Sequence, residues 1–154
     1  VDSRYVNLKY IYCDEWIFFT NYSGPKSEQF KNHNQISAII YWDSIDVQIR
    51  IKANIKKTDK KFSDQHYKNR SSSKNAIAIS SKQSAKIDSY ESVMKNYKEA
   101  LENSNISNKR PSYWGGYSFT PYYFEFWEGN KNRINKRQVF EIDDNSWNCY
   151  FLQP

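Results

Sequence analysis

The chain opens with two apolar segments whose residue types favour β-strands. Residues 5–12 and 16–21 are rich in β-branched and aromatic side chains, and an acidic pair at 14–15 interrupts them. This pattern predicts a hairpin. Residues 23–25, Ser-Gly-Pro, then favour a turn and the start of a short helix over residues 27–32, because Ser caps helices and Pro suits their first turn.

A second pair of strands is predicted over residues 36–42 and 47–58, joined by the polar residues 43–46. From residue 47 to residue 55 every second side chain is apolar, which is typical of a strand with one buried face. Gln48 and Arg50 therefore share the polar face of this strand.

After residue 58 the period changes to that of helices. Residues 59–70 predict one helix, a serine run at 71–73 ends it, and residues 75–79 predict an Ala/Ile-rich turn. Residues 89–103 form the clearest predicted helix. Its apolar stripe consists of Tyr90, Val93, Met94, Tyr97 and Leu101.

The remainder returns to strands. Residues 103–108 predict a polar surface loop, and the Gly- and Pro-containing segment 110–117 interrupts the pattern. Strands are predicted over residues 119–127, 136–142 and 147–152. Six or so antiparallel strands with a few helices favour an α+β, mainly β, protein built around a small barrel.

Composition supports one domain. The chain has 154 residues, of which only 38% are hydrophobic but 18% are aromatic, so rings are expected to fill the core. No segment reaches the roughly 20 apolar residues that cross a bilayer, and no secretory signal is recognisable. We therefore expect a cytoplasmic protein without a membrane partner. Because the chain starts at Val1 without an initiator Met, a missing amino-terminal strand stays open as an alternative.

The distribution of charge and the few Cys and His residues argue against nucleic-acid binding and against a metal site. The net charge of +6 comes from Lys and Arg residues that are spread along the chain, so nucleic-acid binding is a distant alternative. The two cysteines, Cys13 and Cys149, are far apart in sequence, and the only histidines, His33 and His66, belong to no ligand motif. We expect reduced thiols and no metal site.

The residues offer no side-chain nucleophile of a known pattern, and no Gly-rich phosphate loop. Instead, cations lie among aromatic, strand-forming residues: Arg4, Lys9, Lys26, Arg133 and Arg137. Such groups suit the binding of phosphates, with a bound cofactor supplying the reaction.

Several blocks resemble one enzyme family. Residues 110–117, Arg-Pro-Ser-Tyr-Trp-Gly-Gly-Tyr, and residues 124–137 resemble the carboxy-terminal signature of the pyridoxine/pyridoxamine 5′-phosphate oxidases. Further blocks match in the same order at residues 4–9, 18–26, 41–42, 47–50 and 81–84. Several blocks in register make chance similarity improbable.

The resemblance implies a split β-barrel homodimer that binds FMN at the subunit interface, with the single domain 1–154 including a carboxy-terminal dimerisation region at 110–154. It also implies oxidation of pyridoxamine or pyridoxine 5′-phosphate to pyridoxal 5′-phosphate, with O₂ reoxidising the flavin.

Site residues carry over from this resemblance position by position. Arg4 and Lys26 are expected to hold the FMN phosphate. The full set expected to bind FMN is Arg4, Tyr5, Val6, Asn7, Leu8, Lys9, Phe19, Thr20, Lys26, Gln48, Gln83, Ser84, Trp127 and Arg137. The set expected to bind substrate is Lys9, His66, Arg70, Lys74, Arg133 and Asn135, with Arg133 as the catalytic residue.

Four positions depart from the family pattern. Pro25 replaces an arginine, Lys74 a serine and Asn135 a histidine, whereas His66 replaces a tyrosine that the adjacent Tyr67 could provide. Two alternatives follow. One is a flavin oxidase with another substrate, as in phenazine biosynthesis; the other is a protein that binds flavin or pyridoxal phosphate without turnover.

Overall fold

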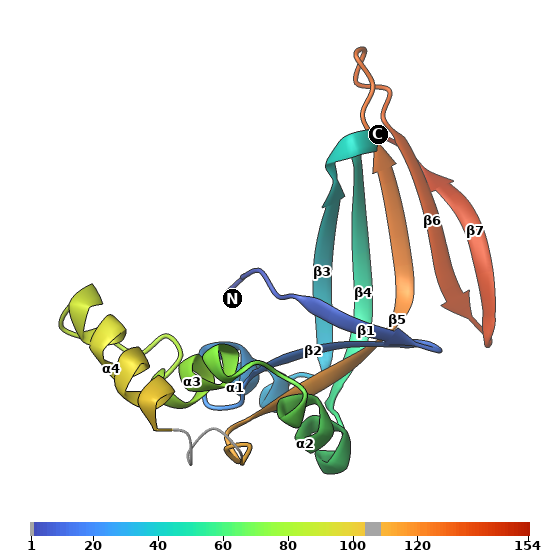
Figure 1. Cartoon of the computed structure of the whole chain (residues 1–154). Coiled ribbons are helices and arrows are strands. Elements are labelled where there is room, and N and C mark those ends of the chain that lie inside the picture. Colours follow the sequence, from blue (N-terminus) through green and yellow to red (C-terminus); the bar gives the residue numbers. More distant parts are fainter. Residues whose placement is uncertain (1, 104–108) are drawn as a thin grey trace.

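The structure is a computed structural model that describes residues 2–103 and 109–154. Within them the chain forms one seven-stranded sheet and four α-helices (Figure 1). The strands are β1 (Leu8–Tyr12), β2 (Glu15–Asn21), β3 (Gln35–Trp42), β4 (Val47–Lys57), β5 (Trp114–Glu128), β6 (Lys136–Asp143) and β7 (Ser146–Leu152). The helices are α1 (Pro25–Asn32), α2 (Lys60–Lys68), α3 (Ser72–Ser80) and α4 (Tyr90–Glu102).

The long strand β5 organises the sheet. Strand β4 pairs with nearly the whole length of β5. Strand β2 pairs with the first half of β5, and β6 pairs with the second half of β5. All of these pairings are antiparallel, and β1, β3 and β7 extend the sheet from β2, β4 and β6. Figure 1 shows β2 and β6 at opposite ends of β5, so the barrel is split rather than continuous.

Aromatic rings fill the core, as the composition predicts. Phe18, Tyr117 and Phe119 are buried with Ile51 and Ile55, and further partly buried rings pack around them. The alternation predicted for residues 47–55 is confirmed from residue 51 onwards, since Ile51, Ala53 and Ile55 are buried and the residues between them are exposed. The core therefore lies where β2, β4 and the first half of β5 meet.

The start of β5 differs from the sequence-based prediction. Strand β5 begins at Trp114 rather than at residue 119, because Gly115 and Gly116 are strand residues packed closely against side chains instead of turn residues. A Cβ at Gly116 would lie 2.6 Å from Thr58 Oγ1, and one at Gly115 would collide with the Tyr22 hydroxyl. These glycines make room for neighbouring side chains.

The segment predicted to be a turn at residues 75–79 belongs to the helix α3. Asn75, Ala76 and Ala78 are buried there, and Asn75 Nδ2 donates a hydrogen bond of 3.2 Å to the carbonyl of Tyr67. Tertiary burial and the high helix propensity of Ala explain why this segment is helical.

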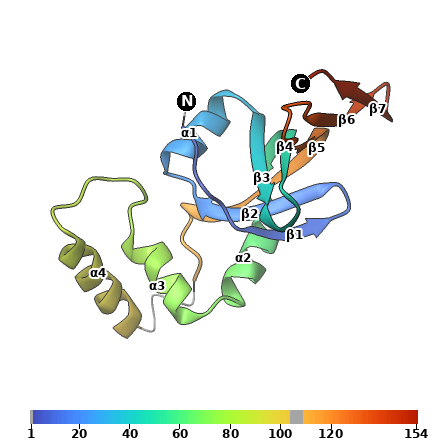
Figure 2. The ribbon, with the colours of Figure 1, turned by 90° about the horizontal axis from the view of Figure 1, so that it is seen from above.

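Helix α4 lies away from the sheet and packs on α3 (Figures 1 and 2). Of its predicted apolar stripe, Tyr90, Met94 and Leu101 are exposed, so one chain covers this face only in part. Most of the loop predicted at 103–108 lies outside the described residues. No helix in the described part of the chain is long and apolar enough to cross a membrane.

Candidate functional site

A first group of predicted residues meets at the start of α1, and we call it the amino-terminal cluster: Arg4, Thr20, Lys26, Gln83 and Ser84. The Lys26 ammonium group donates hydrogen bonds to Thr20 Oγ1 at 2.6 Å and to Gln83 Oε1 at 3.0 Å. Thr20 donates to the same Gln83 oxygen, and Arg4 Nη1 donates to Ser84 Oγ at 3.2 Å. Segments that are far apart in sequence thus converge here.

Lys26 is a buried cation with neutral hydrogen-bond partners. Lys26 is only 6% exposed. Among residues 2–103 and 109–154, no carboxylate forms an ion pair with Lys26. Burial, reinforced by the positive charge of Arg4, lowers the pKa of Lys26 to about 8. An anion at this place would relieve both effects.

The donor set of the amino-terminal cluster fits a phosphate group. It combines two cations with hydroxyl and amide side chains at the amino end of an α-helix, where anions are stabilised. Pro25, which stands where the family has an arginine, occupies the first turn of this helix and adds no donor.

A second group surrounds His66 on α2, and we call it the His66 cluster: Lys9, Tyr10, His66, Arg70 and Lys74. The imidazole stacks on Phe19 with ring centroids 3.6 Å apart, and its Nδ1 lies 2.8 Å from the Tyr10 hydroxyl. Burial, followed by the charges of Arg70, Lys9 and Lys74, lowers the pKa of His66 to about 4. His66 is therefore neutral near pH 7 and faces three cations.

Aromatic packing holds Arg70 in place. Its guanidinium lies 4.3 Å from the centre of the Trp114 ring, and Nη1 donates to Asn75 Oδ1 at 3.2 Å. Tyr67 is only 1% exposed and packs edge-on against Trp114, and its buried hydroxyl has no hydrogen-bond partner among the described residues. Arg70 also lies over the Tyr67 ring at 5.9 Å, so the expectation that Tyr67 provides the missing tyrosine stays a prediction.

A third group lies at the other end of β5. Gln48 on β4 stands opposite Trp127, which in turn stands opposite Arg137 on β6. Residues directly opposite each other in antiparallel strands project from the same face, so these three predicted flavin residues form one row. Arg137 Nε donates to Glu125 Oε1 at 2.8 Å, and its Nη1 donates to the Gln153 carbonyl at 2.9 Å.

Arg133 and Asn135 belong to the connection between β5 and β6, which projects beyond the sheet in Figure 1. The side chain of Asn135 stabilises this turn, because its Oδ1 accepts a hydrogen bond from the backbone nitrogen of Asn130 at 3.0 Å. Arg133 is exposed and has a left-handed backbone with φ of 61°. Asn135 thus has a structural role in this turn.

One chain does not bring all of the predicted residues together. Thr20, in the amino-terminal cluster, pairs with Gly115, whereas Gln48 pairs with Trp127, twelve residues further along β5. This is roughly 40 Å of strand. The residues Tyr5, Val6 and Leu8 lie in an exposed segment at the amino-terminal end.

Two residues were missed by the sequence reasoning. Tyr10, which contacts His66, looked like one more aromatic residue of a strand. Glu125 is buried and binds Arg137; the available signal was an acidic residue between Phe124 and Phe126, two positions before Trp127 and so on the same face.

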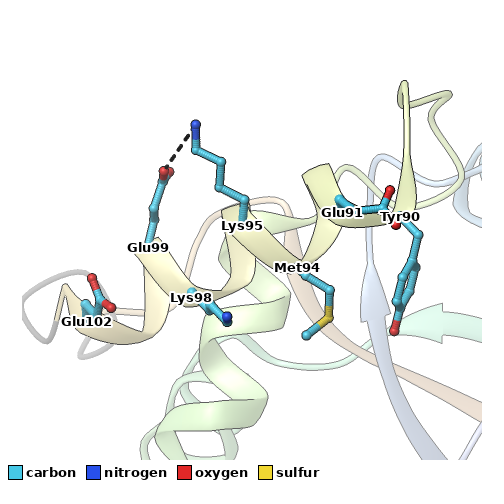
Figure 3. Close-up of a pocket in the computed structure, with 7 residues that line it drawn as sticks. All are labelled: Tyr90, Glu91, Met94, Lys95, Lys98, Glu99 and Glu102. Atoms are coloured by element: carbon cyan, nitrogen blue, oxygen red, sulfur yellow. Dashed lines mark ion pairs between the residues drawn. The ribbon is translucent and has the colours of Figure 1, made fainter.

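Two surface hollows lie apart from these groups. One runs along α4 (Figure 3), and none of the predicted site residues lines it. The other is apolar and is formed by Phe124, Phe126, Phe140 and Trp147 on the opposite face of β5 from Glu125. In the described part of the chain, no three His, Cys, Asp or Glu side chains are grouped so that they could hold a metal ion.

Comparisons with known proteins point to one family. The family described as pyridoxine 5′-phosphate oxidase C-terminal dimerisation region matches residues 114–154. The pyridoxine/pyridoxamine 5′-phosphate oxidase of Colwellia psychrerythraea is 31% identical over 155 residues, which cover 99% of this chain and 70% of that protein.

Solved structures share the fold. A crystal structure of PhzG from Burkholderia lata 383, in complex with tetrahydrophenazine-1-carboxylic acid, superimposes with a TM-score of 0.89 at 26% identity, covering 99% of this chain and 75% of that one. A pyridoxamine 5′-phosphate oxidase-related, FMN-binding protein from Nostoc punctiforme PCC 73102 gives a TM-score of 0.76 at 14% identity, covering 98% and 80%, and shows the fold alone. The split-barrel prediction is confirmed, and the chain belongs to the pyridoxine/pyridoxamine 5′-phosphate oxidase family.

Proposed function

We propose that the protein is an FMN-dependent oxidase that converts pyridoxamine or pyridoxine 5′-phosphate to pyridoxal 5′-phosphate, with O₂ as electron acceptor. The observation that carries this proposal is the presence of two separate cation clusters. One contains Arg4 and Lys26, and the other contains Lys9, Arg70 and Lys74. They are neighbours across β2, since Thr20 belongs to the first and Phe19 contacts the second. Two phosphates, one of the cofactor and one of the substrate, match this charge distribution.

The chain's own residues bind and orient in this scheme. Lys26 and Arg4 hold the FMN phosphate, while Gln48 and Arg137 donate hydrogen bonds to the flavin ring and Trp127 packs against it. Lys9 and Arg70 hold the substrate phosphate, with Lys74 as an additional cation, and Arg133 contacts the reacting end of the substrate. Bound FMN would supply the redox chemistry, a two-electron oxidation of the substrate with O₂ as final electron acceptor.

We infer that the site needs two chains. Lys26 bonds Thr20, which pairs with the start of β5, whereas Arg137 pairs with Trp127, twelve residues further along that strand than the partner of Thr20. Exposed apolar residues also suggest a covered surface, since Ile39 and Trp42 on the edge strand β3 and Phe151 on the edge strand β7 are each more than half exposed. A homodimer in which each flavin contacts both chains accounts for both features.

The test is anaerobic absorbance of the FMN-loaded protein before and after addition of pyridoxamine or pyridoxine 5′-phosphate. The expected result is loss of the oxidised flavin bands and their return when air is admitted. Flavin bands that persist with both substrates would overturn the proposed substrate and leave a protein that binds flavin without this turnover.

A second candidate is a flavin oxidase that acts on a reduced phenazine precursor. It is favoured by the similarity to PhzG, whose crystal structure contains tetrahydrophenazine-1-carboxylic acid, and by Asn135, which cannot titrate near neutral pH. Under this alternative, Asn135→His leaves turnover of pyridoxine 5′-phosphate unimproved, and tetrahydrophenazine-1-carboxylic acid bleaches the flavin. A large gain in pyridoxine 5′-phosphate oxidation by Asn135→His would exclude it.

A further inference from the structure

Glu125 is a buried carboxylate between two arginines. It is 2% exposed, although it lies in the strand that carries the predicted flavin residue Trp127. Its Oε1 accepts a hydrogen bond from Arg137 Nε at 2.8 Å. Its Oε2 accepts from Arg50 Nε at 3.1 Å, from Arg50 Nη2, and from the Tyr123 hydroxyl at 2.9 Å. The carboxylate is thus fully bonded on both oxygens.

The sheet register directs this group towards the predicted flavin row. Arg50 stands opposite Glu125, and Trp127 stands between Gln48 on β4 and Arg137 on β6. Because side chains two residues apart on a strand share a face, all five project from one face of the sheet. Glu125 therefore lies on the same face as the residues expected to contact the flavin ring, one pair of residues along the strands.

Hydrogen bonding also fixes the direction of Arg137. Nε is bound to Glu125 and Nη1 to the Gln153 carbonyl. Nη2 has no hydrogen-bond partner among residues 2–103 and 109–154. A guanidinium held at two nitrogens with the third free is prepared to donate to a ligand.

The carboxylate keeps its charge in this environment. Burial raises the pKa of Glu125, but hydrogen bonds from Arg137, Arg50 and Tyr123 outweigh burial and hold the pKa at about 2. One anion therefore neutralises one of two cations, which leaves a single net positive charge beside Gln48 and Trp127.

We propose that Glu125 is a positioning residue of the flavin site: it aims Arg137 at the flavin and sets the net charge that Arg50 and Arg137 present there. This inference rests on the proposed FMN binding and on the assignment of Arg137 to the flavin. It assigns a role to a residue that does not itself contact the cofactor.

The proposal predicts that Glu125→Gln and Arg50→Gln shift the midpoint potential of bound FMN in opposite directions. Glu125→Gln removes the anion, so the local positive charge increases and the midpoint potential of bound FMN rises; Arg50→Gln removes a cation, so the potential falls. Glu125→Gln also releases Arg137, and the dissociation constant for FMN increases by roughly tenfold or more, the effect of losing one charge-assisted hydrogen bond. Glu125→Asp, which keeps the charge, restores most of the potential.

The measurements are FMN titration of the apoprotein and spectroelectrochemical titration of the loaded protein. Glu141→Gln is the matched control. Glu141 lies on the neighbouring strand β6, and its carboxylate accepts a hydrogen bond from the exposed Tyr150 hydroxyl at 2.7 Å instead of from an arginine. Unchanged potentials in both Glu125→Gln and Arg50→Gln, or shifts of the same sign, would overturn the proposal. If Glu125→Gln fails to fold, the midpoint potential of Arg50→Gln is still informative, because an unchanged or raised potential would overturn the proposal.

Failure of this inference is distinguishable from failure of the proposed function. If the unmodified protein binds no FMN, the proposed function is wrong. If it binds FMN while Glu125→Gln binds as tightly and at the same potential, only the role of Glu125 is wrong.

Discussion

At the scale of single residues, Lys26 shows how burial prepares a side chain for a ligand. With a pKa of about 8, its ammonium group is partly deprotonated in mildly alkaline solution. A bound phosphate favours the charged form and raises this pKa, so binding must take up a proton from solvent.

This linkage gives a pH-dependent prediction. Near pH 9 we expect proton uptake when the apoprotein binds FMN, and an affinity that falls as the pH rises through about 8. Isothermal titration calorimetry in two buffers of different ionisation enthalpy measures the uptake. Lys26→Arg is the matched variant, because arginine stays protonated and removes the uptake while keeping the charge. Equal uptake by both proteins would contradict the assignment.

His66 links the second cluster to acid stability. Its pKa of about 4 in the folded protein lies below the ordinary value of 6.5, so between these values the unfolded chain binds a proton that the folded chain does not. Stability from this source is complete above pH 6.5 and is lost as the pH falls towards 4, by up to about 3 kcal/mol.

Urea denaturation at about pH 7 and about pH 4.5 tests this linkage. His66→Gln is expected to lose less stability on acidification than the unmodified protein. The same substitution at the exposed His33 serves as the control and leaves the pH dependence unchanged. A similar response in both variants would show that His66 titrates normally.

At this scale the sequence predicted which charged side chains meet at one ligand, but it did not predict which charged side chains are buried. Lys26, Gln83 and Thr20 were all expected near one ligand, and the structure brings them together. Burial of Glu125 could not be foreseen with the same ease, because an acidic residue in a strand is usually solvated and only its two arginine partners stabilise it inside.

At the scale of elements, the strands were predicted better than their ends. Content of β-branched and aromatic residues located the seven strands, and alternation identified the buried face of β4. The start of β5 and the helix α3 were missed, since Gly115 and Ala76 owe their conformation to packing against residues distant in sequence. Local pattern contains no information about such neighbours.

The close packing of Gly116 leads to a prediction for β5. Gly116→Ala places a methyl group 2.6 Å from Thr58 Oγ1 and 2.9 Å from its Cγ2, so the strands must separate and the free energy of unfolding falls by about 1–3 kcal/mol. Gly129→Ala, whose methyl group would approach its nearest neighbour no closer than 3.3 Å, is the control. Chemical denaturation of both variants measures the difference; equal stability would show that Thr58 can move freely.

At the scale of the whole molecule, the proposed dimer predicts complementation. Lys26→Ala and Arg137→Ala each damage a different half of the flavin site, so each variant alone binds FMN weakly. In co-expressed protein, random pairing places one undamaged site in every mixed dimer, which makes about a quarter of all sites intact. Tight flavin binding per chain measures this fraction. A mixture that binds no more than the average of the two variants would indicate that both halves come from one chain.

The separation of the two halves along β5 also makes the site depend on concentration. If one flavin contacts both chains, each catalytic unit forms by a second-order encounter, and specific activity must decline on dilution once the dimers dissociate. FMN, which binds the associated form, then shifts that equilibrium towards association. The supply of flavin would set the number of assembled enzymes as well as the number of loaded sites.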